Sequence, residues 1–299
     1  MITTRKLAQY RNGSFLVSLY SDGTKVREQT DSEGIVEFPE SIDLKITEVC
    51  DLNCSYCHEN GRENGNHARV ENIDKVTNGL PPGVEIAIGG GNPFEHPQLK
   101  EILILLKNKG LVASLTVNEL HLFLLHPLRV VLLKEWQQCG LIYGIGISIR
   151  GYLPNSLLDN QLNDVVWHCI LGESTPFDVL ALKRPCKVLL LGDKKYGRGK
   201  DYFANDKPKI DYWKYHLGMV LSREDLLVSF DNLAIEQLDL KSKLPGKVWD
   251  KYYMGDDGQF TMYVDAVKMQ YAKNSISERV NVAGLNIREM FQKVRGLKA

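Results

Sequence analysis

The stretch that decides the fold is TEVCDLNCSYC, residues 47–57, which directly follows a strand-like run at residues 42–47. It places Cys50, Cys54 and Cys57 at the spacing C-x-x-x-C-x-x-C. Thiolates are soft ligands that suit zinc and iron–sulfur clusters. Six cysteines in 299 residues do not make a disulfide scaffold, and three of them fall within this one short stretch. The clustering therefore indicates a metal centre or redox chemistry at the end of the first predicted strand.

Two kinds of metal centre fit this short loop. Three thiolates can bind three irons of a four-iron cluster and leave the fourth iron open for a small molecule. A structural zinc site is closed by a fourth ligand, which His58 or His67 could provide here. The first alternative describes an enzyme or a non-catalytic cluster-binding module such as a cluster carrier. The second describes a zinc-stabilised binding module without turnover.

From residue 41 to residue 192, short strand-like runs alternate with segments of helix length. The predicted strands are residues 42–47, 84–89, 112–118, 143–149, 164–171 and 186–191. The segments 100–107 and 122–138 are predicted to be helical. Six β/α units in series predict an α/β fold with a parallel sheet, open or closed into a partial (β/α)6 TIM-like barrel.

The predicted strands alternate in polarity, although parallel strands covered on both faces usually read as continuous apolar runs. In the fourth strand, Ile145, Ile147 and Ile149 share one face. The opposite face carries Gly144, Gly146, Ser148 and Arg150. We expect the apolar face to meet the helices and the polar face to line the concave inner side. A polar, glycine-containing lining favours a ligand cavity over the bulky, branched core of a filled barrel.

Two extensions flank the predicted barrel at residues 41–192. Residues 1–40 are predicted to form an N-terminal β-hairpin extension, because strand-like runs at 14–20 and 24–30 flank an Asp-Gly turn signal. Residues 193–299 are predicted to be a mixed α/β C-terminal extension packed on the barrel.

Three features of the C-terminal extension yield further expectations. Residues 252–265 are expected to form a hairpin around the Asp-Asp-Gly sequence at 256–258, and residues 285–296 a closing helix. The basic loop at residues 194–200 could touch an anionic substrate such as a nucleotide, but a solvated surface loop explains it better.

The cysteine spacing, the aromatic Tyr56 before the last cysteine, and the position after the first strand resemble the radical S-adenosylmethionine (SAM) superfamily. The likeness extends over residues 41–192. It implies that Cys50, Cys54 and Cys57 hold a [4Fe–4S] cluster whose open iron binds SAM, with Tyr56 among the cofactor-binding residues. It further implies that an electron from the cluster cleaves SAM to methionine and a 5′-deoxyadenosyl radical, which abstracts hydrogen from an unidentified substrate.

The second predicted strand ends in Gly-Gly-Gly-Asn-Pro at residues 89–93. Gly90, Gly91, Asn92 and Pro93 are in register with the Gly-Gly-Glu-Pro motif of the family, which implies that this strand end holds the amino group of the methionine part of SAM. Glycines let a backbone approach a ligand without a Cβ clash. Asn92 replaces the usual glutamate and can accept a hydrogen bond, but it carries no charge.

Later strand ends match the family less closely. Asn118 matches the asparagine of a family sequence at the end of the third strand, and Ser148 and Arg150 imply contacts to the ribose and the carboxylate of SAM. Leu191 ends the sixth strand, where the family usually packs the adenine. If the fifth strand has the same parity, His168 faces inward, where it could act on the substrate or in proton transfer; a satisfied core histidine is the alternative.

Composition limits the partners. The formal net charge is zero, from 37 basic and 37 acidic residues, which gives no support for a partner bound by bulk electrostatics, such as duplex nucleic acid or an anionic membrane. We find no apolar run of the length, about 18 residues, that a membrane span needs and no signal-peptide core, so we expect a cytoplasmic protein.

The chemistry that the resemblance implies needs an electron donor such as flavodoxin or ferredoxin. No cysteine follows Cys186, so residues 193–299 cannot supply a cysteine-ligated auxiliary cluster of the kind that marks many peptide-maturing family members. This absence slightly favours a small molecule or a nucleotide over a peptide as the substrate.

Overall fold

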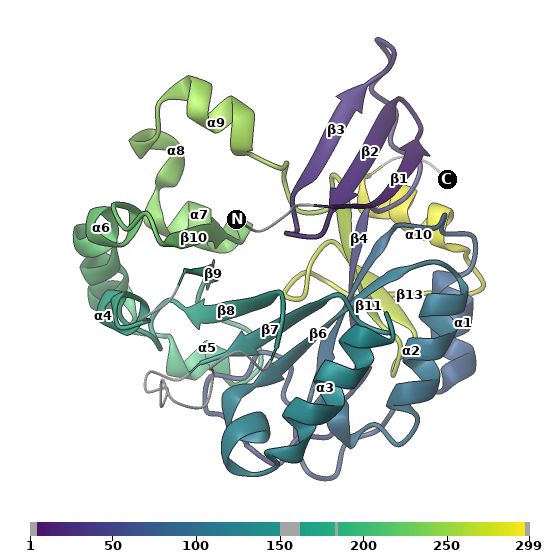
Figure 1. Ribbon diagram of the computed structural model, residues 1–299, viewed down its shortest axis with the longest axis horizontal. Coiled ribbons are helices and arrows are strands. Elements are labelled where there is room, and N and C mark those ends of the chain that lie inside the picture. The colour runs from purple at the N-terminus through teal and green to yellow at the C-terminus, as the bar shows by residue number, and fades with distance from the viewer. Residues whose placement is uncertain (1–4, 150–161, 183–184, 297–299) are drawn as a thin grey trace.

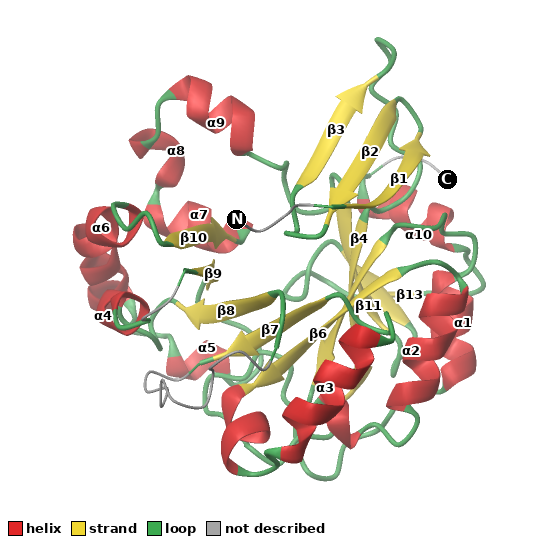
Figure 2. Cartoon of the chain, in the orientation of Figure 1, coloured by secondary structure: helices red, strands yellow, loops and turns green. Residues whose placement is uncertain are grey.

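A computed structural model describes residues 5–149, 162–182 and 185–296. Its centre is a ten-stranded sheet with the order β10-β9-β8-β7-β6-β5-β4-β11-β12-β13. The six predicted parallel strands are confirmed as β4 (Ser41–Thr47), β5 (Glu85–Gly90), β6 (Val112–Asn118), β7 (Gly144–Ser148), β8 (Val165–Ile170) and β9 (Cys186–Leu191). Within the described ranges the two edge strands, β10 and β13, do not pair, so the sheet forms an open, partial barrel (Figures 1 and 2).

Helices α1 (Val70–Thr77), α2 (Leu99–Asn108) and α3 (Leu128–Gln138) cover the outer face of this sheet (Figure 1). The helix predicted at 100–107 is confirmed as α2. The helix predicted at 122–138 is interrupted, because a π-helical turn at Leu120–Leu124 ends before Pro127 and α3 begins after it. Proline restricts the residue before it and lacks an N–H, which favours a helix boundary there. Helices α1 and α4 (Pro176–Leu180) were not predicted.

The burial of the strand residues confirms the predicted alternation. Ile145 and Ile147 are 1% and 0% exposed and belong to the core between the sheet and the helices. Ser148, on the opposite face of the same strand, is half-buried. Strand β6 shows the same pattern, because Leu115 and Val117 are buried while Thr116 is half-buried. The polar residues therefore line the concave inner face of the sheet.

The N-terminal segment forms an antiparallel sheet of three strands, β1 (Lys6–Asn12), β2 (Phe15–Tyr20) and β3 (Lys25–Gln29). The predicted hairpin is confirmed as β2 and β3, and β1 adds a strand that was not predicted. Arg27 joins this small sheet to the rest of the chain: its Nε donates to the buried Glu40 carboxylate at 2.7 Å, and its guanidinium lies 3.9 Å from the centre of the Phe260 ring.

The C-terminal segment adds strands to both edges of the large sheet. Its elements are α5 (Gly199–Tyr202), α6 (Lys207–Leu221), β10 (Leu226–Phe230), α7 (Asn232–Leu238), α8 (Leu240–Lys243), α9 (Gly246–Tyr252), β11 (Thr261–Asp265), β12 (Gln270–Ala272), β13 (Val280–Asn281) and α10 (Ile287–Val294). Strand β10 pairs in parallel with β9, and β11 pairs in parallel with β4. The predicted closing helix is confirmed as α10, and the division of the chain at residues 40 and 192 stays a prediction.

The hairpin predicted at residues 252–265 is wrong. The Asp-Gly signal does mark a turn, because Gly258 has a φ of +80°. The residues before this turn end helix α9 and do not form a strand. Strand β11 instead forms its antiparallel pair with β12, through a turn that contains Met269 at a φ of +52°. The local turn signal was correct. The position of β11 is set by its parallel pairing with β4, which would otherwise be an unpaired edge strand on this side of the sheet.

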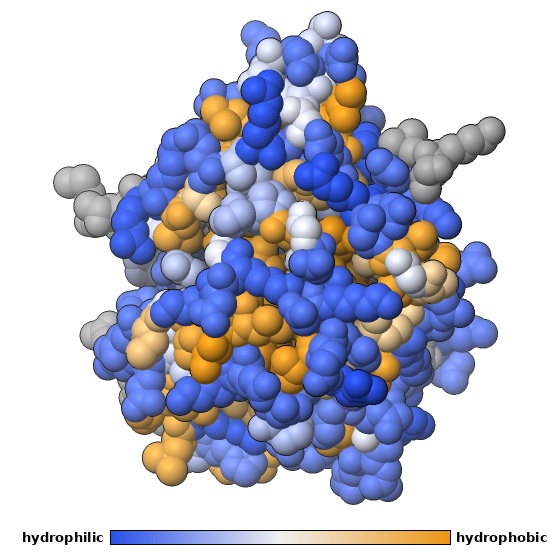
Figure 3. All heavy atoms as spheres, turned by 90° about the vertical axis from the view of Figure 1, so that its right-hand side faces the viewer, coloured by the Kyte–Doolittle hydropathy of each residue, from blue (hydrophilic) through white to orange (hydrophobic). Residues whose placement is uncertain are grey.

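The described residues include no helix that is long and apolar enough to cross a membrane. Hydrophilic side chains predominate on the face of the molecule that carries α1 and α10, and apolar residues are grouped in patches between them (Figure 3).

Candidate functional site

The three cysteines lie on a loop of residues 48–62, called the cysteine loop below, which begins where β4 ends. Two backbone hydrogen bonds close the loop at its base: the Cys50 N–H donates to the Arg62 carbonyl at 3.0 Å, and the Arg62 N–H donates to the Glu48 carbonyl at 2.9 Å. Asn53 and Asn60 adopt positive φ values of 43° and 53°, which asparagine tolerates better than most residues. The chain therefore folds back on itself and places all three thiols, half-buried, at the carboxyl end of the sheet.

The spacing of the three sulfurs differs from that of a bound zinc site. In the described part of the chain, the only three potential ligand atoms that all lie within 4.8 Å of one another come from Cys50, Asp51 and His121. The sulfurs of the three cysteines are therefore not all within that distance. A tetrahedral zinc ion with bonds of about 2.3 Å to sulfur would hold its sulfurs roughly 3.8 Å apart. The three thiols are therefore not gathered at the spacing that one tetrahedral zinc ion would impose.

Neither histidine that could have completed a zinc site joins the cysteines. His67 Nδ1 lies 2.8 Å from the Thr47 hydroxyl, and His58 Nε2 lies 3.5 Å from the Glu59 carboxylate.

Burial raises the pKa of the Cys50 thiol to about 11 in the chain without a metal. Binding a metal must therefore displace a proton from this thiol.

The glycine motif after β5 packs against the cysteine loop. A Cβ on Gly90, whose φ is +112°, would lie 2.5 Å from the Thr47 carbonyl oxygen, and a Cβ on Gly91 would lie 2.3 Å from that of Val49. The Gly91 N–H donates to the Thr47 carbonyl at 2.8 Å, and the Asn92 N–H donates to the Val49 carbonyl at 2.7 Å. The two glycines thus allow a close backbone contact that fixes the start of the cysteine loop. Their contact with the cofactor stays a prediction.

The Asn92 side chain is used within its own turn. Its Oδ1 accepts the Phe94 N–H at 3.2 Å and so caps the 3₁₀ turn Pro93–Glu95, and its Nδ2 donates to Glu95 at 3.1 Å. The residue is 1% exposed. Asparagine therefore replaces the family glutamate here as a helix cap, and a cofactor role for this side chain stays a prediction.

Three other predicted cofactor residues lie on or near the inner face. Asn118 pairs with Ser148 in the register of β6 and β7, and its Oδ1 accepts the Leu120 N–H at 3.0 Å. Leu191 is half-buried at the end of β9. Arg150 falls outside the described residues, and Tyr56 lies in a cluster of aromatic rings, 5.8 Å from the Tyr202 ring centre.

His168 faces the concave side, as its parity predicted. It pairs with Ser148 in the register of β7 and β8, and a Cβ on Gly146 would lie 2.3 Å from the imidazole. Gly146 therefore provides the space that this ring occupies. Burial, with a smaller contribution from the nearby Lys194 ammonium, lowers the pKa of His168 to about 4. The imidazole is therefore neutral at pH 7, and its role in the reaction stays a prediction.

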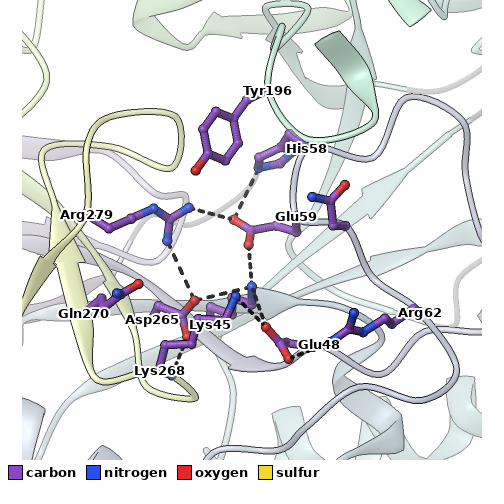
Figure 4. A pocket seen from close by; sticks show the side chains of 11 residues that line it. Lys45, Glu48, His58, Glu59, Arg62, Tyr196, Asp265, Lys268, Gln270 and Arg279 are labelled. Atoms are coloured by element: carbon purple, nitrogen blue, oxygen red, sulfur yellow. Dashed lines mark hydrogen bonds and ion pairs between the residues drawn. The ribbon is translucent and has the colours of Figure 1, made fainter. Parts of the chain in front are cut away.

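A buried network of charges, which the sequence did not predict, lies beside the cysteine loop (Figure 4). Lys45 Nζ lies 3.0 Å from Glu59, 3.4 Å from Asp265 and 3.8 Å from Glu48. Arg279 also forms ion pairs with two of these three carboxylates, Glu59 at 3.9 Å and Asp265 at 3.8 Å. These residues line a cavity of about 210 Å³. The network connects β4, the cysteine loop and the C-terminal segment.

The basic loop of residues 193–200, called the β9 loop below, also contacts the cysteine loop. Arg198 Nε donates to the Cys54 carbonyl at 2.8 Å and Arg198 Nη2 to the Gly61 carbonyl at 3.0 Å. The interpretation of this segment as a solvated surface loop is therefore wrong. The sequence favoured a solvated loop because its lysines and arginine have the pattern of surface charges. No local sequence pattern indicates which of these side chains contacts another part of the chain.

Comparison with known proteins gives a family match over part of the chain. The model of the radical SAM superfamily matches residues 44–155. A probable GTP 3′,8-cyclase of Methanococcus maripaludis is 41% identical over 83 residues, which are 26% of this chain and 28% of that protein. The corresponding protein of Methanococcus vannielii is 40% identical over 83 residues. The matched stretch thus spans little more than a quarter of these curated relatives.

Solved structures show the same fold over most of the chain. Streptococcus suis SuiB bound to S-adenosylmethionine aligns with a TM-score of 0.57 at 12% identity, covering 87% of this chain and 68% of SuiB. SuiB bound to its precursor peptide SuiA aligns with a TM-score of 0.56 at 13% identity, covering 87% of this chain and 66% of SuiB. At such low identity the likeness establishes the fold alone.

Residues 44–155, which include the three cysteines after the first strand of the open parallel sheet, thus match the radical SAM superfamily. The cofactors of this superfamily are a [4Fe–4S] cluster and SAM. The residues present fit the cluster, because three soft, half-buried thiols share one loop at the carboxyl end of β4. Gly61 allows the end of this loop to pack closely against Cys50, since a Cβ there would lie 3.0 Å from the Cys50 Cβ.

Proposed function

We propose that this chain is a radical SAM enzyme in which Cys50, Cys54 and Cys57 hold a [4Fe–4S] cluster. When bound, the cluster supplies the electron that cleaves SAM, and the resulting 5′-deoxyadenosyl radical takes a hydrogen atom from the substrate. The observation that carries the proposal is the placement of three half-buried cysteines at the carboxyl end of β4. Ligands of parallel α/β sheets bind at that end.

The inner face of the sheet supports a cavity for the cofactor and the substrate. A Cβ added to Gly89 meets no atom within 4 Å, so open space lies above β5. Asn118, Ser148 and His168 form one row across β6, β7 and β8 beside this space. We assign hydrogen bonding of SAM to Asn118 and Ser148. The neutral His168 can donate one hydrogen bond and accept another, which suits a polar substrate.

We favour a small molecule or a nucleotide over a peptide as the substrate. Curated relatives that match 26% of this chain are named for a reaction on GTP. No cysteine after Cys186 is present to hold a second cluster. The peptide bound by SuiB belongs to a protein that shares only the fold.

We further propose that the protein works in the reducing environment of the cytoplasm with flavodoxin or ferredoxin as its electron donor. All six cysteines are free thiols, which is the usual state in that compartment. The cluster chemistry itself requires a reductant from outside the chain.

The test is an anaerobic assay for 5′-deoxyadenosine after reconstitution with iron and sulfide and addition of dithionite and SAM. The wild type and a Cys139→Ala control, which changes an exposed cysteine elsewhere, should form deoxyadenosine. Cys57→Ala should form none. If the wild type carries a full cluster and still forms no deoxyadenosine, the proposed activity is wrong.

A further inference from the structure

The β9 loop contacts the cysteine loop chiefly through Arg198. Besides its bonds to the carbonyls of Cys54 and Gly61, Arg198 donates its backbone N–H to the Cys57 carbonyl at 3.1 Å and to the Asn60 side chain at 2.9 Å. Arg198 therefore contacts the cysteine loop at Cys54 and Cys57 and at the residues that follow them, Asn60 and Gly61. Cys50 is held separately, by the backbone bonds at the base of the loop.

We propose that Arg198 is a positioning residue that keeps the cysteine loop in the shape that binds the cluster. The proposal rests on the function proposed above. A loop without regular secondary structure leaves carbonyl oxygens without helix or strand partners. The planar guanidinium can satisfy two such oxygens at once in a fixed geometry, whereas a lysine ammonium on a flexible stem cannot fix both.

The residues on either side of Arg198 are suited to this contact. Gly197 has a φ of +57°, and a Cβ there would lie 2.6 Å from the His58 carbonyl oxygen. A Cβ on Gly199 would lie 2.4 Å from the Lys194 carbonyl oxygen and 3.1 Å from the Tyr56 carbonyl oxygen. The sequence Gly-Arg-Gly thus lets the β9 loop approach the cysteine loop closely and inserts one long cation between them.

The charge of Arg198 has a second consequence. A cluster becomes more negative when it accepts an electron, so a nearby cation favours its reduced form and raises its midpoint potential. Arg198 lies within hydrogen-bond distance of the backbone of Cys54. Removing its charge should therefore lower the midpoint potential, and replacing it with lysine should not. A residue that only stabilised the fold would leave the potential unchanged.

The experiment compares Arg198→Gln and Arg198→Lys with Lys200→Gln, which removes an exposed charge from the same loop. Each protein is reconstituted anaerobically, and iron release to a chelator and the midpoint potential of the cluster are measured. Both Arg198 variants should bind the iron of the cluster about 10- to 100-fold more weakly, the loss that is typical when a residue that supports metal ligands is replaced, and should therefore release iron faster than the wild type. Only Arg198→Gln should show a lower potential, and Lys200→Gln should match the wild type in both.

Urea denaturation of the cofactor-free proteins separates this effect from a loss of fold. The proposal holds if Arg198→Lys unfolds at nearly the wild-type urea concentration and still releases iron faster. It is overturned if Arg198→Gln releases iron at the wild-type rate, if faster release only accompanies global unfolding, or if the wild type binds no cluster. A wild type that binds the cluster but does not cleave SAM would overturn the proposed activity and leave the iron-release comparison decisive for Arg198.

Discussion

Replacing Gly91 with alanine should weaken the contact between the glycine motif and the cysteine loop. The added Cβ would lie 2.3 Å from the Val49 carbonyl oxygen and 2.8 Å from the carbonyl carbon. Both atoms belong to the backbone, so no flexible side chain can move away to relieve the overlap. The φ of Gly91 is not positive, and the cost therefore comes from the close approach alone.

The magnitude follows from what must move. Overpacking of a tight contact typically costs about 1–3 kcal/mol. The displacement also stretches the hydrogen bonds from Gly91 to Thr47 and from Asn92 to Val49, which are 2.8 and 2.7 Å long. Each such bond contributes about 1 kcal/mol. We therefore expect Gly91→Ala to lower the free energy of unfolding by about 2–5 kcal/mol and to reduce iron binding.

Gly89→Ala is the matched control, because a Cβ at this position meets no atom within 4 Å. Urea denaturation of both cofactor-free variants measures the free energy of unfolding, and iron content after reconstitution measures the state of the loop. Gly89→Ala should be neutral or stabilised by up to about 1 kcal/mol. If Gly91→Ala matched Gly89→Ala in stability and in iron content, the assigned role of the close contact would be refuted.

Two further predictions concern buried charges. Glu59→Gln removes the charged partner that lies 3.0 Å from Lys45 Nζ, and it should lower the free energy of unfolding, measured by urea denaturation, by about 1–3 kcal/mol. The control Glu71→Gln, at an exposed site, should have little effect. Equal losses of stability in the two variants would contradict a stabilising role for the network. The pKa of His168 is about 4 in the folded state, against roughly 6.5 unfolded. The unfolded chain therefore takes up the proton first, and stability falls between about pH 6.5 and pH 4. His168→Gln should reduce this fall in the free energy of unfolding by at most about 3 kcal/mol. The control His126→Gln, at an exposed site, should leave the fall unchanged. If the wild type and both variants had identical pH profiles of stability, the result would count against burial of His168.

The sequence predicted the parts of the fold that depend on local pattern. All six parallel strands could be located because apolar runs and strand length are local properties. The inward direction of His168 followed from period-two alternation alone. The cysteine motif was equally local, since all three thiols lie on one loop. These features share a short range in the chain, which is why they could be predicted.

The rest of the site depends on contacts between distant segments. Arg198 meets the Cys54 carbonyl only because β9 and β4 belong to the same curved sheet. Lys45, Glu59 and Arg279 form a network across β4, the cysteine loop and the C-terminal segment, and no spacing in the sequence relates them. Asn92 illustrates another limit, because a position that matches a family motif can be used for a helix cap.

The most direct test of the central claim is the count of iron and acid-labile sulfide per chain after anaerobic reconstitution. The wild type and Cys139→Ala should each contain about four irons and about four sulfides. Single alanine variants of Cys50, Cys54 and Cys57 should lose most of both. Zinc in place of iron, iron without sulfide, or a full cluster in the Cys57→Ala variant would contradict the account.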